Sequence, residues 1–131
     1  MAKAKGTFEV AGWDEKAYQE LGGKAKLTRA SITQSYSGDL DGKGTWELLM
    51  CYRSDGTAVY TGLGTFDGTF EGQAGAFVME SEGTFDGKAA RSKWSVVAGS
   101  AKRGLKGLTG RGTSAAPHGS VGTYDLSLDK S

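Results

Sequence analysis

The chain has 131 residues, of which 37% are hydrophobic, and a formal net charge of +1. This length suits one domain with a buried core, and this composition excludes intrinsic disorder. The single cysteine, Cys51, excludes an internal disulfide, and one histidine with one cysteine excludes the usual metal sites. No apolar stretch approaches a membrane-spanning length, and the N-terminus lacks an apolar signal segment. We therefore expect one cytoplasmic domain over residues 1–131, with no metal, cofactor or membrane partner.

Positive charge gathers in the C-terminal part of the chain. Residues 87–124 contain no acidic side chain and seven basic ones. Two explanations stay open: complementary charge on neighbouring strands, or an anionic ligand or partner near residues 100–111. Lys102, Arg103 and Lys106 have no aromatic residues interleaved with them, which argues against nucleic-acid binding.

Strand signals run along the chain, without sustained helical periodicity. A recurring Gly-Thr-aromatic unit is typical of strands that bend while packing tightly. The unit occurs at residues 6–8, 44–46, 64–66, 68–70, 83–85 and 122–124. Short glycine-containing turns between the units predict hairpins. In chain order, the predicted strands cover residues 6–13, 27–36, 43–53, 57–71, 74–85, 88–98, 109–116 and 119–128.

The segments outside these strands are predicted to be irregular. Residues 14–26 are expected to form a polar loop or short helical turn, and residues 99–108 a glycine-rich connection. Eight strands joined mostly by hairpins predict an all-β fold, a closed eight-stranded antiparallel up-and-down (meander) barrel. Closure is favoured because it removes exposed strand edges.

The hairpin turns determine which residues face each other. A two-residue turn at Asp86-Gly87 places Phe85 opposite Lys88. One face of this strand pair is then apolar, and the other carries opposite charges. The predicted facing pairs are Met79 with Trp94, Phe77 with Val96, Glu80 with Lys93, and Glu82 with Arg91.

Two-residue turns at Gly72-Gln73, Asp55-Gly56 and Asp41-Gly42 extend the inner face to the earlier strands. A barrel of this size is either filled by its side chains or holds one small ligand. The predicted ligand-contacting residues on this wall are Gln34, Tyr36, Glu47, Leu49, Cys51, Tyr60, Met79, Ser81 and Trp94. The outer face of residues 43–53 then carries an apolar stripe that should not face water alone, which predicts a dimer or trimer. The stripe consists of Trp46, Leu48, Met50 and Tyr52.

Glu47 is the candidate catalytic residue. On the inner wall its pKa should rise toward the range useful for acid/base chemistry, with Tyr36 and Tyr60 as hydrogen-bond donors. Two alternatives stay open: a carboxylate held by these tyrosines or water for structural reasons, or one that faces solvent after a register slip. His118 lies in a predicted surface turn, which does not favour catalysis.

Several short segments, specific together but not singly, carry a resemblance to a known family. They are Phe8–Val10 with Trp13–Glu15, Lys26–Ala30, Tyr36–Asp39, Glu47–Tyr52, Gly75–Val78, Gly83–Phe85, Trp94–Val97, and Gly99–Ser100 with Leu105–Gly110. Through them the chain resembles, almost end to end, a bacterial family catalogued as a domain of unknown function, whose members have an allene oxide cyclase-like barrel. The resemblance implies that fold and an oligomer, but no activity. The family commonly has a histidine where this chain has Ser81, so no general-base role carries over to that position.

Three functions are compatible with these observations. The first is a barrel that binds a small, largely apolar molecule in its interior. The second is an isomerase or cyclase that acts on an apolar substrate, with Glu47 as acid/base. The third is a packed barrel that acts through its surface as an oligomeric interaction module. An open cavity favours the first two functions, and a filled interior favours the third.

Overall fold

In the computed structural model, which describes residues 2–117 and 121–130, the chain forms nine strands and no helix. The strands are β1 (Ala2–Gly22), β2 (Ala25–Gly38), β3 (Leu40–Tyr52), β4 (Ala58–Phe70), β5 (Gln73–Phe85), β6 (Ala89–Val96), β7 (Lys102–Arg103), β8 (Leu108–Pro117) and β9 (Gly122–Lys130). None of these residues forms a helix long and apolar enough to cross a membrane. The predicted turn at His118-Gly119 lies outside the described residues.

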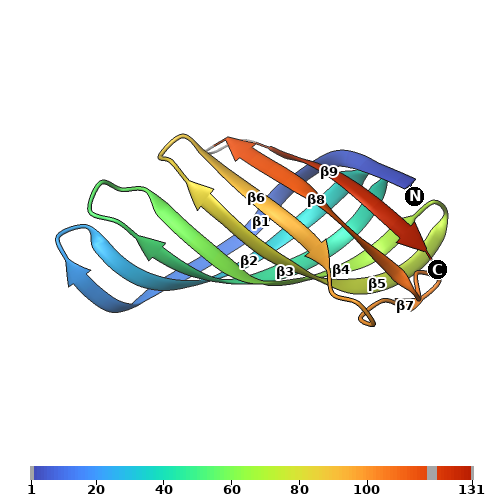
Figure 1. Cartoon of the computed structure of the whole chain (residues 1–131), viewed down its shortest axis with the longest axis horizontal. Coiled ribbons are helices and arrows are strands. Elements are labelled where there is room, and N and C mark those ends of the chain that lie inside the picture. The colour runs from blue at the N-terminus through green and yellow to red at the C-terminus, as the bar shows by residue number, and fades with distance from the viewer. Residues whose placement is uncertain (1, 118–120, 131) are drawn as a thin grey trace.

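The barrel strands pair antiparallel in chain order, with β6 pairing with β8, and the sheet closes on itself. β4 pairs with β5, and β9 returns to pair with β1, so eight of the strands described form a closed barrel (Figure 1). β7 is an additional strand that pairs with Gly75 and Ala76 of β5. The predicted all-β, eight-stranded meander barrel is confirmed.

The two ends of the barrel differ. At one end the connection between β6 and β8, which includes β7, packs the buried side chains of Ala101 and Leu105 against the core. The opposite end, called the open end below, carries the turns between β1 and β2, between β3 and β4, and between β5 and β6. The β1–β2 and β3–β4 hairpins project beyond β8 at that end, to the left in Figure 1. The barrel therefore has a plugged end and an oblique open end.

Residues 14–26 do not form the predicted loop. β1 continues to Gly22 and pairs with β2 as far as Ala25. On its other edge β1 pairs with β9 only over Ala2–Phe8. Beyond Phe8 it forms a projecting ribbon with β2, and most side chains near the tip are exposed on both faces. The apolar alternation that marks a half-buried strand is therefore missing from this part of the sequence.

The predicted register is wrong between β3 and β4. Tyr52 pairs with Ala58, so residues 53–57 separate the strands instead of the two-residue turn at Asp55-Gly56. Asp55 Oδ1 accepts hydrogen bonds from the backbone nitrogen and Oγ1 of Thr57, at 3.0 and 2.6 Å, and these stabilise the longer turn. A five-residue connection in place of a two-residue one exchanges the two faces of β3.

A second connection restores the predicted faces in β2. The last β2–β3 pair is Tyr36 with Gly42, so five residues, and not the two predicted, lie between the paired positions. The second exchange of faces reverses the first one. Ile32, Gln34 and Tyr36 therefore face the interior as predicted.

The last two predicted registers are each wrong by two residues. Phe70 pairs with Gln73 between β4 and β5, and Phe85 pairs with Ala90 between β5 and β6. A register shift of two residues keeps every side chain on its predicted face but changes the residue opposite it on the neighbouring strand. Ser81, not Met79, therefore lies opposite Trp94. The predicted pairs Glu80–Lys93 and Glu82–Arg91 are replaced by the facing pair Glu82–Lys93.

Aromatic rings on the inner face lie over glycines of the neighbouring strand. A Cβ added to any of these glycines would overlap the facing ring. In β1 and β9, two Gly-Thr-aromatic units pair reciprocally, so each ring covers the glycine of the other unit. The pairs of this kind among the described strands include Trp46–Gly64, Tyr60–Gly83, Phe8–Gly122 and Tyr124–Gly6.

A layer of aromatic rings fills the middle of the barrel. The ring centroid of Trp94 lies 5.4 Å from that of Trp46 and 5.5 Å from that of Phe8. Towards the plugged end, Phe66 and Phe77 stack with their centroids 5.0 Å apart. These separations are typical of packed aromatic pairs. The interior is therefore filled from the plugged end to its middle.

Gly64→Ala should destabilise the protein, because the new methyl group would overlap the Trp46 indole. We expect a loss of about 1–3 kcal/mol in the free energy of unfolding, the usual cost of overpacking a core. Gly12→Ala is the control, since its Cβ would meet only the Thr33 side chain, at 2.7 Å from Oγ1, and that hydroxyl can rotate. Chemical denaturation of both variants measures the difference. Equal losses would contradict the packing of Trp46 on Gly64.

Candidate functional site

A pocket of about 320 Å³ lies inside the barrel at its open end. Phe8, Trp46 and Trp94 of the aromatic layer form its floor. Its volume falls at the lower end of the range for small-molecule sites, roughly 300–1,000 Å³. The lining residues are Phe8, Val10, Trp13, Glu15, Ile32, Gln34, Trp46, Leu48, Met50, Tyr52, Tyr60, Ser81, Phe85, Ala90, Ser92, Trp94, Ser114 and Ala116.

The projecting part of β1 forms one side of the mouth. Val10 and Trp13 lie opposite Gln34 and Ile32 of β2 and share their inner face. Both side chains nevertheless remain about half exposed, at 48% and 53%. Large apolar side chains that are inward-facing and still open to solvent are typical of a concave binding site.

Glu15 places a carboxylate at this mouth. Its Oε2 accepts hydrogen bonds from Thr28 Oγ1 at 2.6 Å and from Tyr52 OH at 2.7 Å, and its Oε1 accepts one from Trp13 Nε1 at 3.0 Å. Burial and the neighbouring Glu15 carboxylate raise the pKa of Tyr52, so its hydroxyl stays protonated and donates. No cluster of three or more His, Cys, Asp or Glu side chains that could hold a metal ion occurs in the described parts of the chain.

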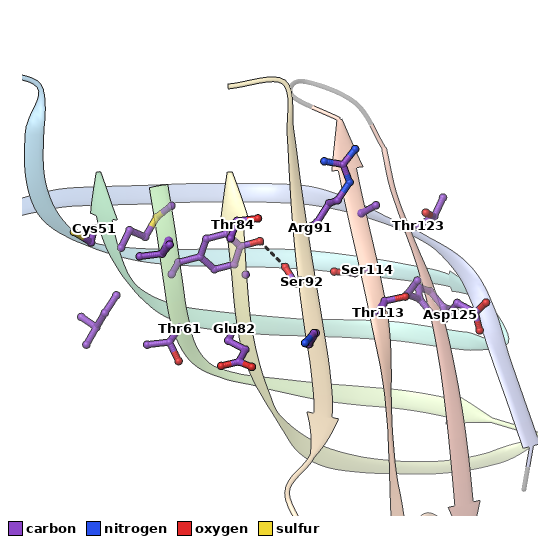
Figure 2. A pocket seen from close by; sticks show the side chains of 18 of the residues that line it. Cys51, Thr61, Glu82, Thr84, Arg91, Ser92, Thr113, Ser114, Thr123 and Asp125 are labelled. Atoms are coloured by element: carbon purple, nitrogen blue, oxygen red, sulfur yellow. Dashed lines mark hydrogen bonds between the residues drawn. The ribbon is translucent and has the colours of Figure 1, made fainter. Parts of the chain in front are cut away.

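The polar groups deeper in the pocket are paired with one another. Trp46 Nε1 donates to Tyr36 OH at 3.0 Å and to Gln34 Oε1 at 3.2 Å. Tyr60 OH and Ser92 Oγ share a hydrogen bond that joins β4 to β6 (Figure 2). Burial raises the pKa of both tyrosines. Within residues 2–117 and 121–130, no buried side-chain nitrogen or oxygen lacks a partner.

A broader depression is lined by outward-facing side chains of the strands and by some inward-facing ones. Figure 2 shows lining side chains from successive strands, among them Thr61 of β4, Glu82 of β5 and Thr113 of β8. It is more open than the interior pocket, and its rim carries charges of both signs, such as Arg91 and Asp125. The depression shares Met50, Tyr60, Ser92 and Ser114 with the interior pocket. Because the interior pocket is the more enclosed of the two, it is the candidate site.

Comparison with known proteins agrees with the barrel. Residues 4–128 match the family described as "Protein of unknown function (DUF3224)". The chain belongs to the DUF3224 family. A solved DUF3224 protein of unknown function from Shewanella oneidensis MR-1 is 26% identical and superposes with a TM-score of 0.84, covering 100% of this chain and 98% of that one. No curated protein matches the chain.

Six of the nine predicted ligand-contacting residues face the interior of this DUF3224 protein. Gln34, Tyr60, Ser81 and Trp94 line the pocket. Tyr36 and Met79 are buried in the core outside its lining. Their inward orientation is confirmed, whereas contact with a ligand stays a prediction.

The predicted orientation of Glu47 is wrong. Its Oε1 accepts hydrogen bonds from Nη2 and Nε of Arg29, at 2.9 and 3.1 Å, on the outer face of the barrel. Gly64 and Gly83 on the inner wall are covered by the Trp46 and Tyr60 rings, so they leave no space beside a carboxylate there. Glu47 is therefore not an interior acid.

The remaining errors on β3 follow from the same exchange of faces. Leu49 and Cys51 lie on the outer face, so they line the broader depression and not the interior pocket. The predicted outer stripe is the inner one: Trp46, Leu48 and Met50 are buried, and Tyr52 is half-buried. These four side chains line the pocket, so they do not provide the predicted surface for self-association. The oligomeric state itself stays a prediction.

The mouth residues were not predicted from the sequence. Val10 lies on a predicted strand, but Trp13 ends it, and Glu15 falls in the segment predicted to be a loop. The available signal was the hydrophobic spacing of Val10 and Trp13, which is three residues because a register shift follows Val10. A bulge of this kind breaks the two-residue alternation by which inward-facing residues are recognised.

The pKa of Glu47 should lie below its ordinary value of 4.5, because hydrogen bonds from Ser31 and Arg29 stabilise the carboxylate. A lowered pKa in the folded state means that this stabilisation is present above the unfolded-state pKa and is lost as the pH falls through the folded-state value. NMR titration should show the shift, and Ser31→Ala should reduce it more than Ser35→Ala. A pKa at or above 4.5 would contradict the outer-face arrangement.

Proposed function

We propose that this DUF3224 protein binds a small, largely apolar organic molecule in its interior pocket. The observation that carries the proposal is the pair of half-exposed apolar side chains, Val10 and Trp13, on the inner face of a pocket with an aromatic floor. Covering apolar surface of this kind releases about 25 cal/mol per Å², and a ligand that enters the pocket would cover it.

The arrangement of polar groups supports an apolar ligand body. Trp46, Tyr36 and Gln34 satisfy one another, as do Tyr60 and Ser92. A ligand that replaced these internal bonds would have to restore each of them, because an unpaired buried polar group costs about 1–3 kcal/mol. Apolar contact with the walls carries no such cost.

The position of Glu47 favours a binding function over the catalytic one. The isomerase or cyclase hypothesis rested on an acid/base inside the barrel, and Glu47 lies outside it, paired with Arg29. Core side chains fill the interior at the plugged end, and the pocket lies at the open end. A ligand can enter there without unfolding the sheet.

Ala116→Phe should block the pocket, whereas Ala115→Phe should not. Ala116 lines the interior opposite Ala90, and the adjacent Ala115 faces outwards. The probe is N-phenyl-1-naphthylamine, a neutral dye whose fluorescence rises in apolar surroundings. We expect saturable binding to the parent and to Ala115→Phe, and an affinity at least about tenfold lower for Ala116→Phe, equivalent to about 1.4 kcal/mol.

Two results would contradict this function. The first is an absence of saturable dye binding to the parent protein. The second is an equal effect of the two phenylalanine substitutions, which would place the dye outside the pocket. Thermal unfolding of both variants serves as the control for folding.

A further inference from the structure

Resting on the proposed function, we infer that the ligand carries a protonated amine, which the Glu15 carboxylate binds at the mouth while the apolar body fills the pocket. The inference starts from charge. Every other described side chain that lines the pocket is apolar or neutral at pH 7, and Glu15 alone is charged. The pocket therefore presents one fixed negative charge at its entrance.

Glu15 forms no ion pair with a side chain of the described residues. The ion pairs formed by these residues involve Asp67, Asp86, Asp125 and Glu47, and none involves Glu15. A half-buried carboxylate that forms no ion pair can bind a cationic ligand group strongly, because a charged hydrogen bond contributes more than a neutral one.

Hydrogen bonding holds the carboxylate in place and leaves one direction free. Two ionised carboxylate oxygens provide about four acceptor positions. Thr28 and Tyr52 donate to Oε2, whereas Trp13 alone donates to Oε1. The remaining position on Oε1 can accept a hydrogen bond from a ligand N–H. Because the three donors come from three strands, the acceptor is oriented before the ligand arrives.

The aromatic surroundings also suit a cation. Trp13 and Tyr52, which donate to Glu15, are pocket residues, and aromatic faces attract cations in partly desolvated sites. Lys26 Nζ lies 5.4 Å from the centroid of the Tyr52 ring at this mouth and forms no ion pair with Glu15. A carboxylate or phosphate on the ligand would instead meet the negative charge of Glu15, and repulsion would disfavour it.

Three probes with the same ring system test the inference: 1-naphthylmethylamine, which is protonated at neutral pH, 1-naphthalenemethanol, which is neutral, and 1-naphthylacetate, which is an anion. Isothermal titration calorimetry gives the affinity of each. We expect the affinity for the amine to be at least about tenfold higher than that for the alcohol, and the anion to bind most weakly. The preference for the amine should decrease as salt is added, since salt screens a partly exposed charge.

Glu15→Gln removes the charge and keeps an acceptor oxygen. In this variant the amine and the alcohol should bind within about threefold of each other, with the affinity for the alcohol unchanged. Glu9→Gln is the matched control, because Glu9 is exposed on the same strand and is absent from the pocket lining. It should retain the preference for the amine. If Glu15→Gln does not fold, the salt dependence measured on the parent decides the question.

The outcomes separate this inference from the proposed function. If none of the three probes binds, the proposed function is wrong. If the alcohol binds and the amine binds no more tightly, the pocket binds apolar molecules and the role of Glu15 is wrong. A preference for the amine that survives Glu15→Gln, or that does not respond to salt, would also overturn the role of Glu15.

Discussion

The structure depends on aromatic rings that lie over glycines of the neighbouring strand. Trp46 covers Gly64, Tyr60 covers Gly83, and side chains of ordinary size at either glycine would exclude the ring. A barrel of this width cannot hold this many indole and phenol groups unless part of the inner wall is flat. The Gly-Thr-aromatic units provide that wall and the rings together, because residues i and i+2 of a strand share a face. The repeated unit in the sequence is thus a packing device.

This packing leaves the pocket at one end only. The aromatic layer and the buried connection between β6 and β8 fill the interior up to the level of Trp94. Above that level β8 ends, while β1 continues past Phe8 and brings Trp13 and Glu15 to the mouth. The pocket therefore consists of an aromatic floor, apolar walls and one held carboxylate. Its shape follows from unequal strand lengths, and its charge follows from one residue of the projecting ribbon.

Much of the fold was predictable, because glycine turns and apolar alternation mark strands locally. Which side chains point into the barrel was less predictable, because the orientation of each strand depends on the number of residues in the connection to its neighbour. Asp55 and Gly56 resemble a two-residue turn, yet the hydrogen bonds that Thr57 donates to Asp55 stabilise a five-residue turn, which places Glu47 on the outer face. Glu15 could not be placed, since an exposed ribbon with register shifts has no regular alternation.

The central claim, that the interior pocket binds an apolar molecule, is tested most directly by NMR on protein with labelled leucine and methionine methyl groups. Leu48 and Met50 of β3 line the pocket, whereas Leu49 of β3 and Leu63 of the adjacent strand β4 are exposed on the outer face. With bound N-phenyl-1-naphthylamine, the account predicts intermolecular NOEs from the dye to the methyl groups of Leu48 and Met50. NOEs to Leu49 and Leu63 in their place would contradict it.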